Sequence, residues 1–536
     1  MKILALDSSG IVASVAVVED DTLLAEYTVN YKKTHSQTLL PMLDEIVKMT
    51  ELELESVDAI AVAAGPGSFT GLRIGSATAK GLGLALKKPL VAVPTVDALA
   101  YNLYVKGRKG ECIMLTAITG VNWGDEGKGR MVDLLSEQYD IVVRYQGGNN
   151  AGHTVINEKG KFILNLLPSG ILRETTVNVM GNGMVIDLEH LVHEIENLRR
   201  GGIAISPENL KISERAVICM PYHKLLDCYE EDRLADAKYG STRRGIAPVY
   251  GDKYMKKALR MGDLFHPETT KARLADIVAY KNLTIEGVYG RPPVSADDMW
   301  AWLVEYGDIL KPYICDAGLY LDKAAKAGKN ILFEAQLGAL RDIDFGIYPY
   351  TSSSNVIGAY APVGAGIPNH KIDRNIGIMK AYSSCVGEGP FTCELFGEEA
   401  EKLRAAGGEY GAATGRPRRV GPFDVVASRY GCRAQGADEI ALTKLDILDS
   451  LDEIPVTVAY ELDGREIHDF PYGDVLEQAK PVNKMFKGWR TDISGCRKKE
   501  ELPREALEYI AFIEEAVGVK IKYVSVGAER DQYIVL

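Results

Sequence analysis

No run of about 18 apolar residues occurs in this 536-residue sequence, and this absence excludes a membrane-spanning helix. There is no C-x-x-C pair either, and the eight cysteines stand alone. Isolated cysteines in a chain of this size predict reduced thiols and a cytoplasmic location, not a disulfide framework. The opening MKILALDSSG has one lysine and a strand-like run broken by Asp7, so we expect no secretory leader.

Positive charge is also in short supply. Lysine and arginine total 62 against 74 aspartate and glutamate residues, and the formal net charge is −12. This deficit argues against a broad nucleic-acid-binding surface, although it leaves room for a local basic pocket. Core-forming material is plentiful, because 46% of residues are hydrophobic and 25% are charged, the mix of a soluble globular protein. The length predicts roughly two to four domains.

The first hundred residues show a continuous series of strand and helix patterns that predicts one structural unit. Three short β-rich runs, KILALDS, VASVAVVED and TLLAEYTVN, predict a three-stranded meander. They are followed by the helical pattern SQTLLPMLDEIVKMTEL, the strand AIAVAAG, the loop GPGSFTG, the helix LRIGSATAKGLGLAL and the strand PLVAVP. The order β-β-β-α-β-α-β predicts a small mixed α/β lobe over residues 1–105. Residues 106–111 are short, polar and glycine-containing, which is typical of a linker.

A larger unit is predicted over residues 112–536. It opens with the buried strand CIMLTAITG, and further strands such as YDIVVRYQG, NILFEAQ, EIALTKLD and YVSVG alternate with helical stretches. Alternation of helices with apolar strands predicts an α/β fold whose mostly parallel sheet has helices on both faces.

A glycine-rich loop, GVNWGDEGKGR, follows the first strand of this unit and spans residues 120–130. Its glycines permit backbone N–H groups to close on an anion, and the following helix adds its positive N-terminal end. Lys128 supplies a point charge for phosphate oxygens. The spacing differs from a Walker motif, and Gly129 stands where that motif has Ser or Thr, so Asp125 is the candidate Mg²⁺ ligand. A structural glycine turn is the alternative.

The segment QGGNNAGHT, residues 146–154, follows the strand DIVVRY. Its small residues permit a ligand to approach the backbone closely. His153 comes just after a strand end, a usual position for chemistry in α/β sheets. The alternative is a histidine with a purely structural role.

Two further loops carry candidate binding residues. In T-K-L-D, residues 443–446, the Asp446 carboxylate can accept hydrogen bonds from N1–H and the 2-amino group of guanine, and Lys444 can lie along the purine face. The loop GAATGRPRR, residues 411–419, places three arginines among small residues, which is typical of a carboxylate or phosphate pocket. The alternatives are a solvated loop for the first segment and a solvent-facing basic patch for the second.

Taken in order, the motifs WGDEGKGR, QGGNNAGHT, PSGIL, GSTRRGIAP, YPYTSSSN, GPFTCELFG, GAATGRPRR, LTKLD and SVGAER closely resemble the adenylosuccinate synthetase family. The resemblance runs from about Glu111 to Leu536. It implies a P-loop NTPase-like fold and a GTP- and Mg²⁺-dependent ligation of IMP with L-aspartate. The product is adenylosuccinate, formed through 6-phosphoryl-IMP. The resemblance also implies a homodimer.

The same resemblance implies roles for individual residues. Asp125 would be the base at N1 of IMP, His153 the acid and Lys128 the phosphate-binding cation, with Asp125 and the Gly152 carbonyl as Mg²⁺ ligands. The implied GTP-binding residues are Gly124, Glu126, Gly127, Lys128, Gly129, Arg130, Gly152, His153, Thr154, Arg418, Lys444, Leu445, Asp446, Ser525, Val526 and Gly527. The implied IMP-binding residues are Asp125, Asn150, Ala151, Thr242, Lys256, Gln336, Ser352 and Arg416. The implied L-aspartate-binding residues are Ala412, Ala413, Thr414, Gly415, Arg416 and Arg418.

Three positions depart from the family pattern. The family commonly reads F-E-G-A-Q-G where this chain has FEAQLG at residues 333–338, which leaves the register of Gln336 open. Lys256 stands where many members have an arginine that reaches across a dimer to the IMP phosphate, and lysine keeps the charge without the fork. Ser352 replaces a threonine and retains the hydroxyl.

Residues 1 to about 105 resemble a different family, the N-terminal lobe of TsaB, a partner in making threonylcarbamoyladenosine on tRNA. The motifs are LALDSS, THSQ at residues 34–37 and AGPGSFTGLRIG at residues 64–75. They imply a ribonuclease-H-like, actin-type lobe that lacks its usual second lobe. A non-catalytic role follows, with a TsaD-type protein as candidate partner. We expect residues 7–9 to form a capped turn and His35 to be a helix N-terminal residue.

Three classes of function compete at this point. The favoured one is a purine-pathway ligase that carries a truncated adaptor lobe. A tRNA-modification partner with an inactive C-terminal part is disfavoured, because Asp125, Lys128, His153, Arg416 and Asp446 are all retained. A regulatory GTPase is disfavoured by the arginine loop. For the N-terminal lobe, an accidental fusion is the alternative to a working module whose apolar surface the synthetase domain or a second copy covers.

Overall fold

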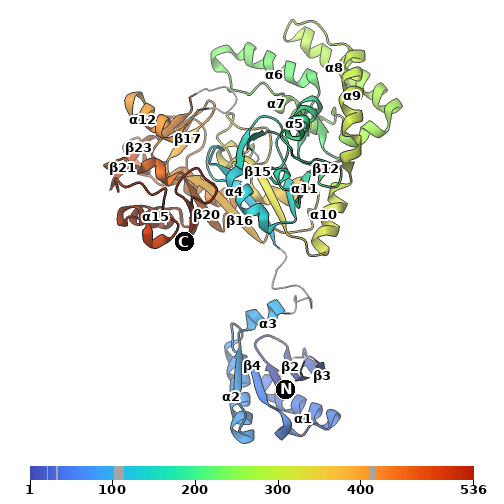
Figure 1. Ribbon diagram of the computed structural model, residues 1–536, viewed down its shortest axis with the longest axis vertical. Coiled ribbons are helices and arrows are strands. Elements are labelled where there is room, and N and C mark those ends of the chain that lie inside the picture. Colours follow the sequence, from blue (N-terminus) through green and yellow to red (C-terminus); the bar gives the residue numbers. More distant parts are fainter. Residues whose placement is uncertain (21, 32–33, 102–113, 158–159, 411–416) are drawn as a thin grey trace. The chain divides into compact units, whose positions relative to one another are not determined.

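A computed structural model describes residues 1–20, 22–31, 34–101, 114–157, 160–410 and 417–536. The chain forms two compact units, Met1–Cys112 and Ile113–Leu536 (Figure 1). The predicted linker, residues 106–111, lies outside the described residues. Within the described ranges, none of the helices combines the length and the apolar character that a bilayer crossing requires.

The first unit is built on a five-stranded sheet of order β3-β2-β1-β4-β5. Its strands are β1 (Lys2–Asp7), β2 (Ala13–Glu19), β3 (Thr22–Val29), β4 (Ala59–Ala63) and β5 (Leu90–Val93). The first three form an antiparallel meander, whereas β4 and β5 run parallel to β1. Helices α1 (His35–Thr50) and α2 (Phe69–Leu86) complete the predicted order β-β-β-α-β-α-β, which is confirmed, and α3 (Thr95–Tyr101) follows.

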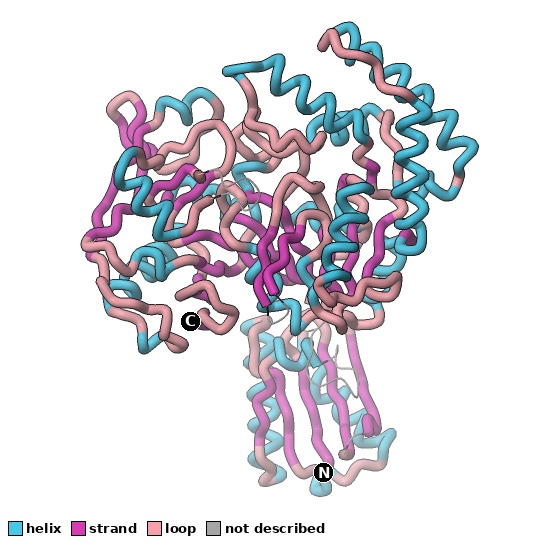
Figure 2. Tube along the Cα trace, turned by 45° about the horizontal axis from the view of Figure 1, so that its top comes forward, coloured by secondary structure: helices cyan, strands magenta, loops and turns pink. Residues whose placement is uncertain are grey.

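The core of this unit lies between one face of the sheet and the helices α1 and α2, which pack against each other. Leu4 and Leu6 of β1 are buried and pair in register with Ile60 and Val62 of β4. Because successive side chains alternate across a strand, these four point to the face that the two helices cover. The strands of this five-stranded sheet lie side by side in Figure 2.

Two local predictions for the first unit are confirmed. Asp7 Oδ1 accepts a hydrogen bond from the Ser9 amide at 2.8 Å, which makes a capped turn, and His35 is the first residue of α1. Helix α2 differs from prediction, because it begins at Phe69, inside the expected loop GPGSFTG. The reason is Ser68, whose hydroxyl accepts from the Gly71 amide at 3.3 Å and caps the helix earlier.

The second unit is organised around a ten-stranded sheet of order β14-β12-β10-β7-β15-β6-β16-β20-β24-β25 (Figure 1). Every neighbouring pair is parallel except β24 and β25, so the predicted mostly parallel sheet is confirmed. The strands are β6 (Leu115–Gly120), β7 (Ile141–Arg144), β10 (Val177–Met180), β12 (Leu210–Ser213), β14 (Ile314–Cys315), β15 (Ile331–Gly338), β16 (Arg374–Lys380), β20 (Glu439–Thr443), β24 (Ile521–Ser525) and β25 (Tyr533–Val535).

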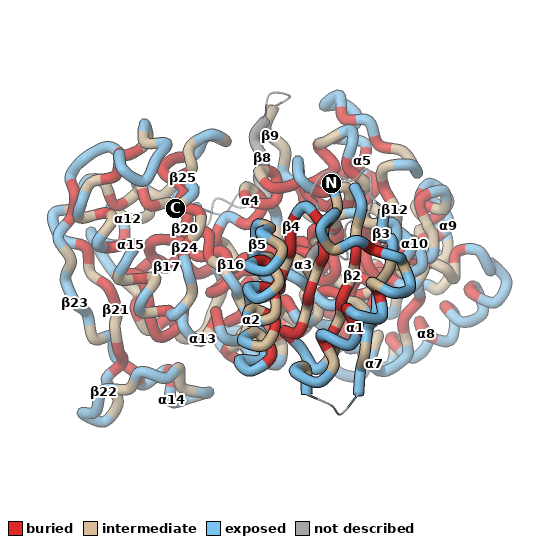
Figure 3. The backbone as a smooth tube through the Cα atoms, turned by 90° about the horizontal axis from the view of Figure 1, so that it is seen from below, coloured by how far each residue is buried: buried red, intermediate tan, exposed pale blue. Residues whose placement is uncertain are grey.

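Helices cover both faces of this sheet. On one face, Ile118 of β6 and Leu332 of β15 pack with Val132 of α4 (Lys128–Leu135). On the other face, the adjacent residues Ala117 and Phe333 pack with α10 (Ala317–Lys326) and α11 (Ala361–Ala365). Adjacent strand residues point to opposite faces, so a sheet buried on both sides requires unbroken apolar runs. Figure 3 shows this interior in the buried colour.

Further helices and small sheets surround the large sheet. The helices are α5 (Leu188–Arg200), α6 (Pro221–Leu234), α7 (Ile246–Met255), α8 (Pro267–Gly287), α9 (Ala296–Leu310), α12 (Gly397–Gly407), α13 (Val425–Gln435), α14 (Asp474–Gln478) and α15 (Arg504–Val517). The small sheets pair β8 (His153–Asn157) with β9 (Gly160–Leu164), β11 (Val185–Ile186) with β13 (Val217–Ile218) and β17 (Ser383–Cys385) with β18 (Arg419–Gly421). A last sheet contains β19 (Phe423–Asp424), β21 (Glu453–Leu462), β22 (Arg465–Ile467) and β23 (Lys480–Lys487).

Candidate active site

Six neighbouring parallel strands of the large sheet, β7, β15, β6, β16, β20 and β24, end at the same edge. The carboxyl ends of parallel strands are where α/β sheets place their ligands. The glycine-rich loop follows β6, the segment 146–154 follows β7, and T-K-L-D begins at the last residue of β20. The topology therefore brings together motifs that lie far apart in the sequence.

The glycine-rich loop needs glycine at two positions. Gly124 and Gly127 have φ angles of 111° and 90°, in a region that side chains disfavour. A Cβ on Gly124 would also lie 2.7 Å from the Cα of Leu337 at the end of β15. Gly127 is the N-cap of α4, so the helix starts at Lys128, inside the motif and before the predicted run MVDLLSEQ. The positive end of the helix dipole is thus part of the loop itself.

Lys128 and Glu126 form a buried ion pair inside this loop. Lys128 Nζ lies 2.9 Å from Glu126 Oε2 and donates to the Gly124 carbonyl at 3.0 Å. Glu126 Oε1 accepts from the amides of Asn122 and Gly124 at 3.0 and 2.7 Å. Glu126 therefore organises the loop from within, and a phosphate group would compete with it for Lys128.

Asp125 faces a cluster of cations. Its Oδ2 lies 2.7 Å from the Ser384 hydroxyl, 3.2 Å from Lys380 Nζ and 3.5 Å from Arg418 Nε. Burial raises the pKa of Asp125, but Lys380 and Arg418 together outweigh it and hold that pKa below its ordinary value. Asp125 is consequently an ionised carboxylate at neutral pH, suited to binding a cation.

Glu409 lies next to Asp125 in the same cluster and is fully buried. It binds Lys380 at 2.9 Å, Arg418 at 2.8 Å and Lys444 at 2.6 Å. The Arg418 amide also donates to the Glu409 carbonyl at 2.9 Å, so the two residues are joined by backbone and side chain. One carboxylate thus connects the end of β16, the arginine loop and T-K-L-D.

The T-K-L-D segment presents an unpaired acceptor. Lys444 has a left-handed φ of 59° and donates to the Gly407 carbonyl and to Glu409, both at 2.6 Å. Leu445 is buried in the core. Asp446 Oδ1 is buried without a hydrogen-bond partner among the described residues, and burial raises the pKa of Asp446. Leaving such a group unmatched costs about 1–3 kcal/mol, which favours a ligand that donates to it.

Arg130 connects the glycine-rich loop to the end of β24. Its guanidinium donates to the Ser525 hydroxyl at 2.7 Å and to the Gly527 carbonyl, and also to carbonyls of Glu529 and Gln532. Val526 points into the core, and a Cβ on Gly527 would collide with the Gln532 side chain. The first turn of α4 and the segment after β24 therefore form one wall.

Gln336 and Asn150 meet at the peptide groups of Gly148. Gln336 Nε2 donates to the carbonyls of Gly148 at 2.8 Å and Asn165 at 3.1 Å, and Asn150 Oδ1 accepts from the Gly148 amide at 3.2 Å. Gln336 Oε1 is buried and has no hydrogen-bond partner within the described ranges. The structure thus brings two residues of the predicted IMP set together, with one free acceptor.

Ser352 joins this group through a chain of hydrogen bonds. Its hydroxyl lies 3.2 Å from that of Ser354, which donates to Gln146 Oε1 at 3.0 Å. Gln146 Nε2 in turn donates to the Gln336 carbonyl at 2.8 Å. A substitution at any residue of this hydrogen-bond series would alter the position of Gln336.

Thr242 lies in the loop before α7, and Lys256 directly follows the last residue of α7. Asp227 of α6 accepts from the Ser241 hydroxyl at 2.6 Å and the Gly245 amide at 2.8 Å, which anchors the loop that carries Thr242. Thr242 itself is exposed. Lys256 is exposed at the C-cap of α7, with a left-handed φ of 63°. No described contact links Lys256 to the other predicted site residues.

Comparison with known proteins adds to this geometry. The family model described as adenylosuccinate synthetase matches residues 117–534. The adenylosuccinate synthetase of Carboxydothermus hydrogenoformans is 46% identical over 420 residues, which cover 78% of this chain and 98% of that protein. This chain belongs to the adenylosuccinate synthetase family.

Two further relatives agree with this family membership. The adenylosuccinate synthetase of Synechococcus sp. (strain JA-2-3B'a(2-13)) is 46% identical over 420 residues, 78% of this chain and 93% of that protein. The structure of fully ligated adenylosuccinate synthetase from Plasmodium falciparum matches with a TM-score of 0.74 and 35% identity, over 79% of this chain and 99% of that chain. The resemblance and the α/β fold predicted from the sequence are confirmed.

The first unit has separate matches. The family model of tRNA N6-adenosine threonylcarbamoyltransferase matches residues 22–194, a range that continues past this unit into the synthetase match. YeaZ from Pseudomonas aeruginosa is 36% identical over 19% of this chain and 48% of that chain, with a TM-score of 0.18. The family match confirms the expected likeness of this unit to proteins that form threonylcarbamoyladenosine.

Part of the predicted synthetase site lies beyond what the structure describes. His153 and Thr154 begin β8 and pair with Leu164 and Ile163 of β9, but their side chains are outside the described part. The sequence placed His153 at a strand end, whereas β7 ends at Arg144 and His153 begins the next strand, directly after Ala151 and Gly152; β8 contacts α4. The other predicted site residues that lie outside the described ranges are Ala412, Ala413, Thr414, Gly415 and Arg416.

Sequence reasoning missed Lys380, Ser384 and Glu409. Lys380 is a charged residue at the carboxyl end of the buried strand RNIGIMK, and the strand-end rule that singled out His153 would also have found it. Ser384 gives no comparable signal. Glu409 follows an exposed helix end in the run GEEAEKLRAAGGEY, where a glutamate is ordinarily solvated. Its burial is evident only from the folded structure, where Lys380 at the end of β16 and Lys444 just after β20 bind it.

The donor set fits a magnesium ion that is shared with a nucleotide. The hydrogen bonds and ion pairs described for Asp125 fall on Oδ2, which leaves Oδ1 for a ligand. No group of three His, Cys, Asp or Glu side chains that would suit a metal occurs within the described part of the chain. The free oxygen of the Asp125 carboxylate suits Mg²⁺, which prefers oxygen ligands and completes its shell with phosphate oxygens and water.

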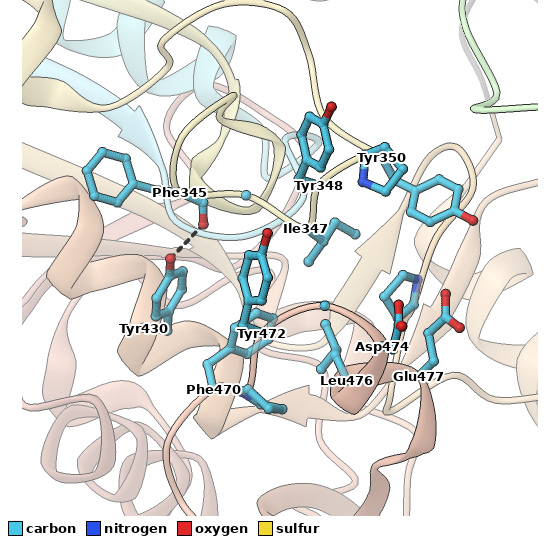
Figure 4. A pocket seen from close by; sticks show the side chains of 15 residues that line it. Phe345, Ile347, Tyr348, Tyr350, Tyr430, Phe470, Tyr472, Asp474, Leu476 and Glu477 are labelled. Atoms are coloured by element: carbon cyan, nitrogen blue, oxygen red, sulfur yellow. Dashed lines mark hydrogen bonds between the residues drawn. The ribbon is translucent and has the colours of Figure 1, made fainter.

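A cavity of about 220 Å³ lies elsewhere, between residues 345–350 and the segment 470–477 (Figure 4). Aromatic rings dominate its lining, including Tyr348, Tyr430 and Tyr472, and Asp474 and Glu477 lie at its edge. It contains no residue of the predicted site, and its carboxylates would repel phosphate. This cavity is therefore not where we place the substrates.

Proposed function

We propose that this chain is a carbon–nitrogen ligase that joins IMP and L-aspartate to give adenylosuccinate, with GTP converted to GDP and phosphate. The observation that carries the proposal is the convergence of Asp125, Arg418 and Lys444 at the carboxyl edge of the sheet. This convergence occurs in a chain that spans 98% of a curated adenylosuccinate synthetase. The expected cytoplasmic location is part of the same proposal.

Asp125 is the proposed general base. As an ionised carboxylate, it would accept the N1 proton of IMP, so that O6 becomes nucleophilic towards the γ-phosphoryl group of GTP. The resulting 6-phosphoryl-IMP loses phosphate when the amine of L-aspartate attacks C6. Proton transfer by a positioned side chain typically contributes about 10²–10⁴-fold to the rate. We assign His153 as the acid on the basis of the family resemblance.

Lys128, the loop amides and α4 would hold the GTP phosphates. When phosphate oxygens enter the loop, they take the place of Glu126 and the Gly124 carbonyl as partners of Lys128. Bound Mg²⁺, held by Asp125 and Gly152, would supply charge neutralisation on the phosphates. Positioning and charge neutralisation are the main contributions that proteins make to phosphoryl transfer.

The guanine would lie between T-K-L-D and the end of β24. The Asp446 carboxylate, whose Oδ1 is unpaired, would accept from the N1–H and 2-amino groups, and Arg130 holds the segment of Ser525 and Gly527 beside the loop. Adenine presents an acceptor at N1 and lacks the 2-amino group, so it cannot satisfy Asp446. The arrangement supports selection of GTP over ATP.

IMP and L-aspartate would bind in the parts of the proposed site that GTP does not occupy. The free Gln336 Oε1, with Asn150, Ser352 and Thr242 on neighbouring loops, is the proposed IMP surface. Arg418 and the preceding residues 412–416 are the proposed carboxylate-binding segment, because guanidinium groups bind carboxylates in bidentate fashion. We also propose a homodimer in which the exposed Lys256 reaches the IMP phosphate of the partner subunit.

For the first unit we propose protein binding rather than catalysis. Its strands expose apolar side chains, among them Leu23, Leu24 and Tyr27 on β3 and Leu90 and Val91 on β5, which a partner would cover. A second copy, the synthetase unit and a TsaD-type protein are the candidates. Release of a soluble, folded 1–105 monomer by limited proteolysis near Gly107 would contradict two of these candidates. It would show that neither the synthetase unit nor a second copy is needed to cover the exposed apolar residues.

The decisive experiment is a phosphate-release assay with GTP, IMP and L-aspartate, in which each substrate is omitted in turn. We expect phosphate and adenylosuccinate only when all three are present. Phosphate release from GTP alone at the same rate would indicate a GTPase. Absence of product with all three substrates would favour an inactive synthetase part.

A further inference from the structure

Glu409 is buried beneath three cations that come from three segments of the proposed site. Lys444 precedes the guanine-binding Asp446, Arg418 belongs to the L-aspartate motif, and Lys380 ends β16 and also binds Asp125. The Tyr382 hydroxyl donates to the same carboxylate. Glu409 is 0% exposed and is covered by these partners. It therefore has no surface left for a substrate.

The charges around Glu409 come closest to balance when Glu409 is ionised. Burial raises its pKa, but Lys380 and Lys444 outweigh burial and hold the pKa well below its ordinary value. Three cations then share two carboxylates, Glu409 and Asp125. If position 409 were neutral, the cations would have Asp125 alone as a close anionic partner. Buried cations that lose their anionic partner either move to a new position or destabilise the folded state. The geometry of the cluster therefore depends on Glu409.

We propose that Glu409 is a positioning residue that couples the GTP side of the site to the L-aspartate side. The inference rests on the proposed function. Lys444 and Arg418 are held on opposite oxygens of one carboxylate, so a nucleotide that fixes Lys444 also fixes Arg418. Three of the IMP residues, Gln336, Asn150 and Ser352, belong to a separate hydrogen-bond chain, which Glu409 does not enter among the described contacts.

The test is steady-state kinetics of Glu409→Gln in the full chain, since glutamine keeps the shape and removes the charge. We expect the KM values for GTP and for L-aspartate to rise about tenfold, the usual scale of coupling between two sites. The KM for IMP should change less than about twofold, which is the scale of an uncoupled site. Glu409→Asp retains the charge and should restore part of both affinities.

Glu401→Gln is the matched control. Glu401 lies on α12, a few residues before Glu409, and it is exposed while bound to Arg404 and Tyr410. All three KM values should be unchanged in this variant. An equal rise of the three KM values in Glu409→Gln, or a loss of kcat with KM values unchanged, would overturn the coupling.

Failure of the proposed function is separable from failure of this inference. A wild-type chain that makes no adenylosuccinate contradicts the function, whereas an active wild type with unaltered kinetics in Glu409→Gln contradicts only the inference. If Glu409→Gln does not fold, Lys444→Met, Arg418→Met and the double variant replace it. Their effects on the KM for L-aspartate should deviate from additivity by about fivefold or more, and additive effects would refute the coupling.

Discussion

The guanidinium of Arg130, in the first turn of α4, donates a hydrogen bond to the hydroxyl of Ser525, which ends β24, across 395 residues of sequence. The same guanidinium binds backbone carbonyls of the segment that follows. The wall proposed for guanine therefore depends on an arginine that the family resemblance assigned only to GTP binding in general.

Arg130→Met should weaken GTP binding while leaving the fold intact. The substitution removes charged hydrogen bonds that are worth about 1.5–3 kcal/mol each, so we expect the KM for GTP to rise by roughly 10–100-fold. The KM values for IMP and L-aspartate should change much less. Arg200→Met, at an exposed arginine bound to Asn197, is the control. A GTP affinity equal to that of the control would show that Arg130 does not order the guanine wall.

Asp125→Asn should abolish adenylosuccinate synthesis. Asparagine fills the same space next to Ser384 and Lys380 but neither accepts the N1 proton nor carries the charge that Mg²⁺ needs. Loss of the base alone typically costs about 10²–10⁴-fold in rate. Product formation is measured by chromatography, and the melting temperature checks the fold. Asp140→Asn, which removes a surface pair with Lys329, should keep full activity. Parent-level activity in Asp125→Asn would refute its assignment.

Asp446→Asn should reduce discrimination between GTP and inosine triphosphate. An amide presents one acceptor and one donor, so one guanine N–H group would lose its partner. We expect the KM for GTP to rise roughly tenfold or more, on the scale of one hydrogen bond to a charged group. Inosine triphosphate lacks the 2-amino group, so its KM should rise less. An unchanged ratio of the two KM values would argue against a guanine contact at Asp446.

Asp424→Asn should change how stability depends on pH. Asp424 is buried at the N-cap of α13, and burial raises its pKa to about 6. The folded state therefore binds the proton more tightly than the unfolded chain. The contribution of Asp424 to stability is full below about pH 4 and is lost as the pH rises to about 6. A shift of this size corresponds to about 3 kcal/mol.

Asparagine is neutral at every pH, so the melting temperature of Asp424→Asn relative to wild type should rise between pH 4 and pH 6 and then stay level. Other carboxylates titrate in both proteins and cancel in the difference. Asp308→Asn, at an exposed residue of α9, should give a flat difference. A flat difference for Asp424→Asn as well would mean that Asp424 titrates normally.

Much of the fold was predictable from local patterns. The apolar runs at residues 141–143 and 440–442 must be buried on both faces, and their alternation with helices predicted the parallel sheet. The glycine-rich loop was predictable because it follows a strand directly. Tertiary pairing was not predictable, since the partners of Glu409 lie on β16, in the arginine loop and after β20. Nor does spacing in the sequence show that Glu126 holds Lys128 inside its own loop.

Gly124 rests against the backbone of Leu337, and Leu337 itself has a left-handed φ of 62°, an unusual conformation for leucine. The glycine-rich loop proposed for the triphosphate and the end of β15, which carries Gln336, are therefore in direct backbone contact without space between them. A substitution that adds a larger side chain on either side of this contact must displace the other side. Redesign of the enzyme for a different phosphate donor would then alter its choice of purine acceptor, unless both sides are rebuilt together.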